Sequence, residues 1–191
     1  HLLEQRHNGY GFDFQVQPKA SIGDIDPDAV YKFLETANSV RNLNENTLLP
    51  VEIILQKLEL LKDEGITNAA LLLFGKEPHK FFHTYYETKC GHFPVAEGYG
   101  EISNDKEYAY NIIENFNLSL AFIKDSIRMS ATKNGVLRTE EWELPISVLR
   151  EALVNMIVHR DYRQNIKNTI EIRPSFISFY NPAHLFRPAI T

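Results

Sequence analysis

The sequence predicts an α/β fold of the α+β kind: a helix-rich middle region with a small sheet, followed by a helix and a hairpin. Two kinds of pattern predict it. Some segments space their apolar residues at the helical period, and others are short apolar or alternating runs bounded by turn residues. The helical segments are expected at about 27–41, 50–60 and 105–128, and from Pro145 through the ridge that ends at His159. The strands are expected at 68–74, within 81–102, at 169–172 and at 176–180.

The first helices have recognisable beginnings. Asp26-Pro27-Asp28 supplies an N-cap, a first-turn proline and an acidic first turn, so a helix is expected over 27–41. A second helix begins near Pro50 and runs through Leu60, and Asn68–Phe74 then has the composition of a buried strand. This order is similar to that of a winged helix. The second helix offers one lysine against two glutamates, which favours a packing element over a DNA-reading one.

The second half contains the longest predicted helix. Asn104 followed by Glu107 has the spacing of a helix cap, and the apolar period continues over about 105–128. Pro145 then opens another helix. Beyond it, Thr169–Ile172 and Phe176–Tyr180 flank Pro174-Ser175 as a candidate hairpin.

Composition limits the function classes. The 191 residues are 43% hydrophobic and 24% charged, which is typical of a globular protein. No apolar run is long enough to cross a bilayer, and one cysteine cannot form an internal disulfide, so a cytoplasmic protein is expected. The formal net charge of −5 argues against a chain whose main task is to grip nucleic acid. Any DNA binding is expected in another part of a longer protein.

The helix after Pro145 carries polar residues at an unusual spacing. Glu151, Asn155 and His159 fall at i, i+4 and i+8, so they form one polar ridge on an otherwise apolar helix. A carboxylate that can orient water, one turn before an amide that can ligate a hydrated cation, is a suitable layout for a nucleotide–Mg²⁺ site. ATP is therefore the first candidate ligand, with Glu151 as the catalytic residue.

An alternative interpretation needs no ligand. Glu151 could be a solvated helix residue, Asn155 a core amide bonded to the backbone, and His159 and Arg160 cations favoured by the helix dipole. Asp161 would then order the following loop.

Two segments resemble one family. One segment is similar to the signature of bacterial transcriptional regulators with a Schlafen/AlbA-like DNA-binding domain, some of them labelled helicase-related. It consists of Leu144-Pro145-Ile-Ser-Val-Leu-Arg-Glu-Ala-Leu-Val-Asn-Met-Ile-Val-His-Arg-Asp-Tyr162, followed after the hairpin by Asn181-Pro182. Thr67-Asn-Ala-Ala-Leu-Leu-Leu-Phe-Gly-Lys76 resembles a second segment of the same proteins. The first signature is similar to the N-box of the gyrase, histidine-kinase and MutL (GHKL) ATPases.

The resemblance implies roles for single residues. Glu151 would align water for attack on the γ-phosphate, Asn155 would bind Mg²⁺, and Asp161 and Asn181 would belong to the ATP site. Where relatives have glycines after Asn-Pro, this sequence has Ala183 and His184, which hinder close approach of the backbone to adenine. The second glycine-rich segment is expected beyond residue 191. An ATPase is thus implied for the intact protein, and this chain alone is expected to be inactive.

The resemblance also divides the chain into three parts. Residues 1–24 are expected to be an arm or the tail of a preceding domain, 25–138 a mixed helix and strand region, and 139–191 the start of a GHKL-like domain. The expected function is that of a transcriptional regulator with a degenerate ATP-binding domain, whose DNA contacts lie elsewhere. The alternative is a non-catalytic scaffold that binds a protein partner, including a homo-oligomer.

A zinc-binding module is a further alternative. His79, His83, Cys90 and His92 lie within fourteen residues and supply suitable ligand atoms. They lack the paired Cys-x-x-Cys spacing of recognisable zinc sites, so scattered surface histidines are the favoured interpretation. The sequence also lacks a Gly-x-x-x-x-Gly-Lys-Ser/Thr motif, which excludes a P-loop in this chain.

Overall fold

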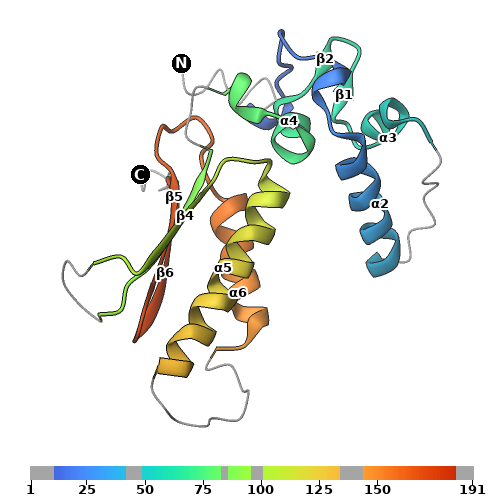
Figure 1. Ribbon diagram of the computed structural model, residues 1–191. Coiled ribbons are helices and arrows are strands. Elements are labelled where there is room, and N and C mark those ends of the chain that lie inside the picture. Colours follow the sequence, from blue (N-terminus) through green and yellow to red (C-terminus); the bar gives the residue numbers. More distant parts are fainter. Residues whose placement is uncertain (1–10, 42–48, 83–85, 96–100, 134–143, 184–191) are drawn as a thin grey trace, which may run out of the picture. The chain divides into compact units, whose positions relative to one another are not determined.

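The computed structural model forms two compact units, residues 1–82 and residues 83–191. It describes residues 11–41, 49–82, 86–95, 101–133 and 144–183, the side chains of 128–133 excepted. Five α-helices and six β-strands occur in these ranges (Figure 1), so the predicted α+β class is confirmed. Within the same ranges, no helix combines the length and the apolar character needed to span a membrane.

The first unit is mainly helical. The helix expected over 27–41 is confirmed as α2, and the backbone N–H of Asp28 donates to Oδ1 of Asp26 before its first turn (3.1 Å). The elements follow in the order η1 Phe12–Phe14, η2 Ile22–Asp24, α2 Pro27–Arg41, α3 Val51–Lys57, β1 Leu61–Lys62, β2 Gly65–Ile66, α4 Asn68–Phe74 and η3 Pro78–Lys80.

The strand predicted at Asn68–Phe74 is wrong, because these residues form the helix α4. Thr67 caps it: the backbone N–H of Ala70 donates to Thr67 Oγ1 (3.2 Å), and that hydroxyl donates to the carbonyl of Leu60 (3.0 Å). A short, wholly apolar run fits a buried strand and a buried helix equally well. Here the N-cap decides between them.

Helix α3 is shorter than predicted, ending at Lys57 instead of Leu60. Glu59 has a φ of 60°, in the left-handed region, and Leu60 donates its N–H to the carbonyl of Leu55 (2.8 Å). The N–H of Glu59 also reaches the carbonyl of Gln56 (3.0 Å), which completes a Schellman motif. Glycine usually occupies this position, so a glutamate gave no sequence signal for the end of the helix.

The segment before α2 is bonded to the rest of its unit. The side-chain amide of Asn68 donates to the carbonyl of Phe12 (3.0 Å), and the backbone N–H of Asn68 donates to the carbonyl of Gln15 (2.8 Å). Val16 forms an isolated β-bridge with Thr67. These contacts attach residues 12–16 to the start of α4.

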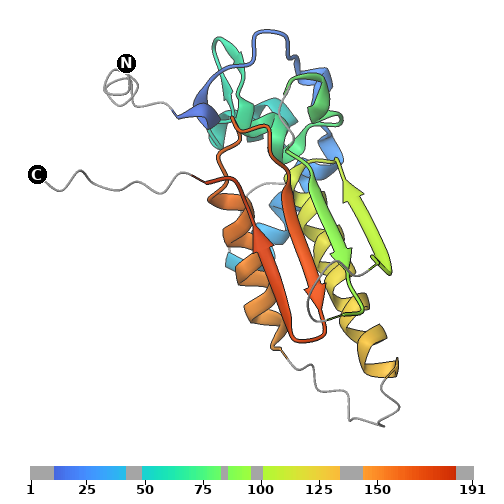
Figure 2. The same ribbon diagram turned by 90° about the vertical axis from the view of Figure 1, so that its left-hand side faces the viewer.

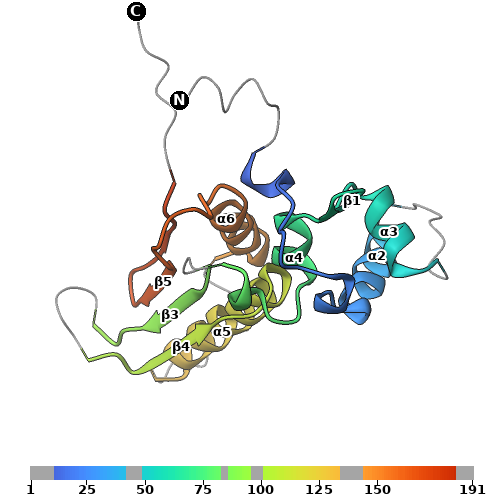
Figure 3. The same ribbon diagram turned by 90° about the horizontal axis from the view of Figure 1, so that it is seen from above.

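The second unit is a four-stranded sheet with two helices on one face (Figures 2 and 3). The strand order is β4-β3-β5-β6; β3 and β5 are parallel, and the outer pairs are antiparallel. Its elements are β3 Thr88–His92, β4 Asn104–Tyr108, α5 Ile112–Lys133, α6 Ile146–Val158, β5 Asn168–Arg173 and β6 Phe176–Tyr180. The helix after Pro145 and the C-terminal hairpin are therefore confirmed.

The predicted start of the long helix is wrong. Asn104 and Glu107 lie in strand β4, where they pair with His92 and Lys89 of β3. Helix α5 begins at Ile112, after a cap in which Asn111 Oδ1 accepts from the backbone N–H of Glu114 (2.9 Å). The sequences that begin at Asn104 and Asn111 share the Asn-x-x-Glu spacing of a helix cap, so the spacing alone does not show which of them caps the helix. The pairing of β4 with β3 places Asn104 in a strand and leaves Asn111 as the cap.

A hydrophobic core joins the helices to the sheet. Helix α5 contacts β3, β4 and β5, whereas α6 contacts β6 and α5. The buried members are Cys90, Leu120, Phe122, Ile123, Leu149, Leu153, Met156, Ile157, Ile170 and Ile172. Every second residue of β5 from Asn168 is buried, as expected for a strand with one face against helices. The core thus fixes one face of α6 and leaves the other to solvent.

Candidate functional site

The polar ridge of α6 lies on the helix face that the core does not use. Leu149, Leu153, Met156 and Ile157 are the buried residues of this helix, whereas Glu151, Asn155 and His159 are exposed. The side chain of Asn155 is therefore not a core amide, which excludes that part of the alternative interpretation. Glu151 makes no hydrogen bond or ion pair with another described residue, and its side chain is exposed.

Two hydrogen bonds attach the C-terminal end of α6 to the turn that follows β6. Asn181 Nδ2 donates to the carbonyl of Met156 (2.8 Å), and the backbone N–H of Asp161 donates to the carbonyl of Pro182 (2.8 Å). Asn155 immediately precedes Met156 in the helix. These bonds place Asn181 and the backbone of Asp161 at the C-terminal end of α6. The side chains of Asn155 and Glu151 lie on the exposed face of the same helix.

Asp161 is held by its own loop. Its carboxylate oxygens accept from Arg163 Nε (2.8 Å) and Arg163 Nη2 (3.0 Å), and Oδ1 also accepts the backbone N–H of Arg163 (3.1 Å). These bonds hold the pKa of Asp161 near 2, below its usual 3.8. The carboxylate is therefore charged and already engaged, as expected if it orders the loop after the helix.

Arg160 is a structural residue that the sequence reasoning treated only as a helix-end cation. It is buried, its Nη1 donates to Asn168 Oδ1 (3.0 Å), and its guanidinium carbon lies 5.3 Å from the centre of the Tyr162 ring. Burial lowers its pKa, but an arginine remains charged. Arg160 thereby joins the end of α6 to the start of β5. The sequence signal for this interaction was Asn168, a polar residue at an inward-facing position of β5, because a buried side-chain amide needs a hydrogen-bond partner.

Apolar side chains flank the ridge. Val148, Val154 and Val158 project from the solvent face of α6 and are between 43% and 65% exposed. These valines carried no separate signal in the sequence, where the helix was expected to be apolar apart from the ridge. Exposed aliphatic groups beside an exposed carboxylate and an exposed amide form a mixed surface, suited to a partly apolar ligand or a protein partner.

The suggested zinc ligands have other surroundings. Cys90 is fully buried in β3 with its thiol 3.8 Å from Ser119 Oγ, and burial raises its pKa to about 11. His92 Nδ1 lies 2.7 Å from Ser103 Oγ. His79 lies in η3 of the first unit, and His83 is outside the described residues. Among the described residues, no three His, Cys, Asp or Glu side chains form a group that could hold a metal ion.

Comparison with known proteins adds information on the fold alone. A family model described as "Domain of unknown function (DUF8451)" matches residues 1–86, which end close to the boundary between the two units. The crystal structure of the DIP2311 protein from Corynebacterium diphtheriae has a similar fold, with a TM-score of 0.66 at 21% identity over 98% of this chain. This chain spans 30% of that protein's length. No curated protein matches the sequence.

Proposed function

We propose that this chain is a degenerate nucleotide-binding part of a bacterial transcriptional regulator whose DNA-binding region lies elsewhere in the protein. It binds Mg²⁺-ATP weakly on the solvent face of α6 and does not turn it over. The observation that carries the proposal is the pair Glu151 and Asn155, exposed on one ridge of α6, a helix whose last turn is bonded to Asn181 through the carbonyl of Met156.

The available atoms fit a magnesium nucleotide. Mg²⁺ prefers oxygen ligands and keeps several waters, so the amide oxygen of Asn155 and the phosphate oxygens suffice as direct ligands. Glu151 can hold a water by hydrogen bonding. The Asn181 amide nitrogen is used by Met156, whereas its Oδ1 accepts no hydrogen bond from a described residue and can accept one from an adenine amino group. Asp161 orders the loop that follows α6.

Turnover requires more than these atoms. The γ-phosphate must be held in line with the attacking water and shielded from bulk solvent. Glu151 is exposed, and Ala183 is also exposed at a position where a glycine would give the backbone closer access to a base. Binding without hydrolysis is therefore the expected behaviour of residues 1–191.

Titration with a fluorescent ATP analogue tests the proposal. The chain should bind the analogue in Mg²⁺ and lose roughly ten-fold in affinity in EDTA or in Asn155→Ala, the scale of one lost charge-assisted contact. Ser147→Ala, on the same exposed face, is the matched control and should bind normally. Phosphate release should stay at background in the wild type and in Glu151→Gln. Equal affinity of Asn155→Ala and wild type would show that Asn155 does not ligate the magnesium ion. ATP hydrolysis by the wild type that is lost in Glu151→Gln would show that the site is catalytic and not degenerate.

The exposed valines favour a second candidate, a scaffold that pairs with another copy of the same chain through α6. Such a surface should self-associate, and replacing Val154 and Val158 by serine should shift the protein to monomer in sedimentation velocity. The same double variant should retain nucleotide binding if the nucleotide proposal holds. The two functions can therefore be separated in one set of variants.

A further inference from the structure

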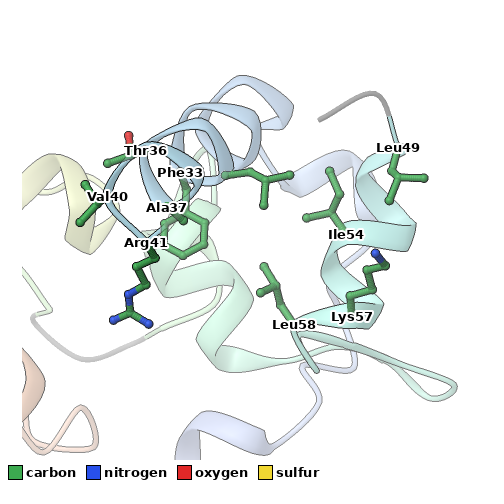
Figure 4. A pocket seen from close by; sticks show the side chains of 10 residues that line it. Phe33, Thr36, Ala37, Val40, Arg41, Leu49, Ile54, Lys57 and Leu58 are labelled. Carbon is green, nitrogen blue, oxygen red and sulfur yellow. The ribbon is translucent and has the colours of Figure 1, made fainter. Parts of the chain in front are cut away.

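The two units expose apolar side chains in different ways. In the first unit, Phe33 and Leu58 are half-buried, because they line a pocket between α2 and α3 and face its other apolar side chains (Figure 4). In the second unit, Phe176 and Tyr180 are 46% and 54% exposed and lie at the two ends of strand β6. Strand β6 is the last strand on one side of the four-stranded sheet (Figure 2), so these aromatic side chains lie at a sheet edge.

The two edge strands of this sheet differ in charge. Strand β4, at the opposite edge, carries Asp105, Lys106 and Glu107, and charged side chains of this kind protect an edge strand from pairing with another chain. Strand β6 has the sequence Phe-Ile-Ser-Phe-Tyr and carries no charge. An uncharged edge strand with exposed aromatic side chains is suited to pairing with another strand.

The outward-pointing backbone groups of β6 belong to Ile177 and Phe179. In β5, the carbonyl of Ile172 accepts the N–H of Phe93 (2.9 Å), so the even-numbered residues of β5 direct their backbone groups towards β3. The odd-numbered residues of β5 therefore bond to β6, where they pair with every second residue from Phe176. The N–H and C=O groups of Ile177 and Phe179 point out of the sheet edge, and none of them bonds to another described residue.

The sequence of β6 is nearly symmetric about Ser178. An apolar residue lies on each side of it, Ile177 and Phe179, and an exposed aromatic residue lies at each end, Phe176 and Tyr180. Two β6 strands related by a two-fold axis at Ser178 would pair along their whole length. Ile177 of one copy would exchange backbone hydrogen bonds with Phe179 of the other, and Phe176 would lie across from Tyr180.

Other registers are less favourable. A shift by one residue would set the outward-pointing groups of one strand against groups that are already bonded to β5. A shift by two residues would leave one exposed aromatic side chain of each strand without its cross-strand neighbour. The symmetric register alone uses the free backbone groups of both Ile177 and Phe179 and pairs both aromatic ends.

We propose that β6 is a homodimer interface, in which two copies of this chain join their sheets edge to edge through antiparallel β6 strands. A second copy is the partner because β6 is complementary to itself in backbone groups, in aromatic side chains and in its lack of charge. The paired segment is short, so we expect a Kd on the order of 10–100 µM. This surface differs from the exposed valines of α6, and the proposal does not depend on nucleotide binding.

Disulfide trapping tests the interface and its register. The two Ser178 residues would form a pair without backbone hydrogen bonds, with Cα atoms about 4.5 Å apart, which a disulfide can bridge. Ser178→Cys treated with diamide, which oxidises two thiols to a disulfide, should therefore run as a covalent dimer on a non-reducing gel. Tyr180→Cys is the matched control and should stay monomeric, because the two Tyr180 residues would lie about 13 Å apart along the strands. Cys90 is fully buried and is common to both variants, so it cannot explain a difference between them.

A mixture of variants tests the antiparallel pairing. Phe176→Cys and Tyr180→Cys should each stay monomeric when oxidised alone. An equimolar mixture of the two should form the mixed covalent dimer, because Phe176 of one copy lies across from Tyr180 of the other.

Sedimentation velocity tests the interface without a cross-link. The wild type should shift from monomer towards dimer as its concentration rises through the expected Kd. Phe176→Ser/Tyr180→Ser should weaken the dimer roughly ten-fold or more, because both aromatic pairs are lost. Ile102→Ser/Tyr110→Ser is the control, since it removes two equally exposed apolar side chains that flank β4, and it should associate like the wild type.

Two results would overturn the proposal. One is a wild type that stays monomeric at about ten times the expected Kd, and the other is equal cross-linking of Ser178→Cys and Tyr180→Cys. A dimer that Val154→Ser/Val158→Ser disrupts and Phe176→Ser/Tyr180→Ser does not would also contradict it, because the contact would then lie on α6. None of these results alters the expected effect of Asn155→Ala on nucleotide binding, so the two proposals can fail separately.

Discussion

The side-chain amide of Asn181 donates a hydrogen bond of 2.8 Å to the backbone carbonyl of Met156. Met156 lies in the last turn of α6, where carbonyls have no partner within the helix, and Asn181 immediately follows β6. One bond therefore satisfies a helix-end carbonyl and fixes the turn after the hairpin. The family resemblance implies that Asn181 belongs to an ATP site, and in the structure its side-chain amide also has a structural role at the end of α6.

Asn181→Ala should lower the free energy of unfolding by about 1 kcal/mol, the typical net value of one such bond. Denaturant unfolding of the variant beside the wild type would measure this difference in the free energy of unfolding. Ala183→Ser, at an exposed position two residues on, is the control and should stay within about 0.5 kcal/mol of wild type. An unchanged stability in Asn181→Ala would show that the bond contributes nothing to the fold.

The two faces of α6 should respond differently to truncation. Leu153 is fully buried, so Leu153→Ala should cost about 2–5 kcal/mol by opening a cavity. Glu151 is exposed, so Glu151→Ala should change the stability by less than about 0.5 kcal/mol. Thermal or denaturant unfolding of both variants beside the wild type measures the contrast. A large loss in Glu151→Ala would identify its carboxylate as a structural partner and remove the main residue of the nucleotide proposal.

The carboxylate of Asp161 should make stability depend on acid pH. Its folded pKa is about 2, below the usual 3.8, chiefly because the Arg163 side chain donates to it. A depressed pKa stabilises the folded state above the unfolded pKa, and this contribution disappears as the pH falls from about 4 towards 2. Because Arg163 is 59% exposed, water screens the pair, and we expect a contribution of about 1 kcal/mol.

Asp161→Asn is the matched variant for this prediction. It should be less stable than wild type at pH 7, and the difference should shrink between pH 4 and pH 2. Denaturant midpoints measured at pH 7, 4, 3 and 2 would show it. Parallel curves for the two proteins would mean that Asp161 titrates with the same pKa in the folded and unfolded states.

The sequence predicted elements whose boundaries carry local chemical signals. Asp26 and Pro27 begin α2, Pro145 precedes α6, and the hairpin turn is marked by Pro174. The apolar side of α6, opposite the polar ridge, is the side that is buried. In these cases the residues near the boundary determine the local structure by themselves.

The errors occurred where distant residues choose between local options. Asn104-x-x-Glu107 has the spacing of a helix cap, but Glu107 pairs with Lys89 across two strands. The run from Asn68 suits a buried strand as well as a helix, and Thr67 capped it as a helix while bonding to Leu60. Arg160 could be read as a helix-end cation because its partner, Asn168, is eight residues further along the chain. Such partners are defined by the fold.

Cys90 provides a probe of how often the second unit opens. Its side chain is fully buried, and burial raises its pKa from 9.0 to about 11, so the thiolate fraction at pH 8 falls about 100-fold. Reaction with a thiol reagent at pH 8 should therefore be at least about 100-fold slower in the native protein than in denaturant. Cys90→Ser supplies the background. Because the thiol reacts through opening of the core, Leu153→Ala should accelerate the reaction by the same factor as it raises the open population, whereas Glu151→Ala should not. A native rate equal to that in denaturant would show that the thiol is accessible and that β3 does not hold Cys90 in the core.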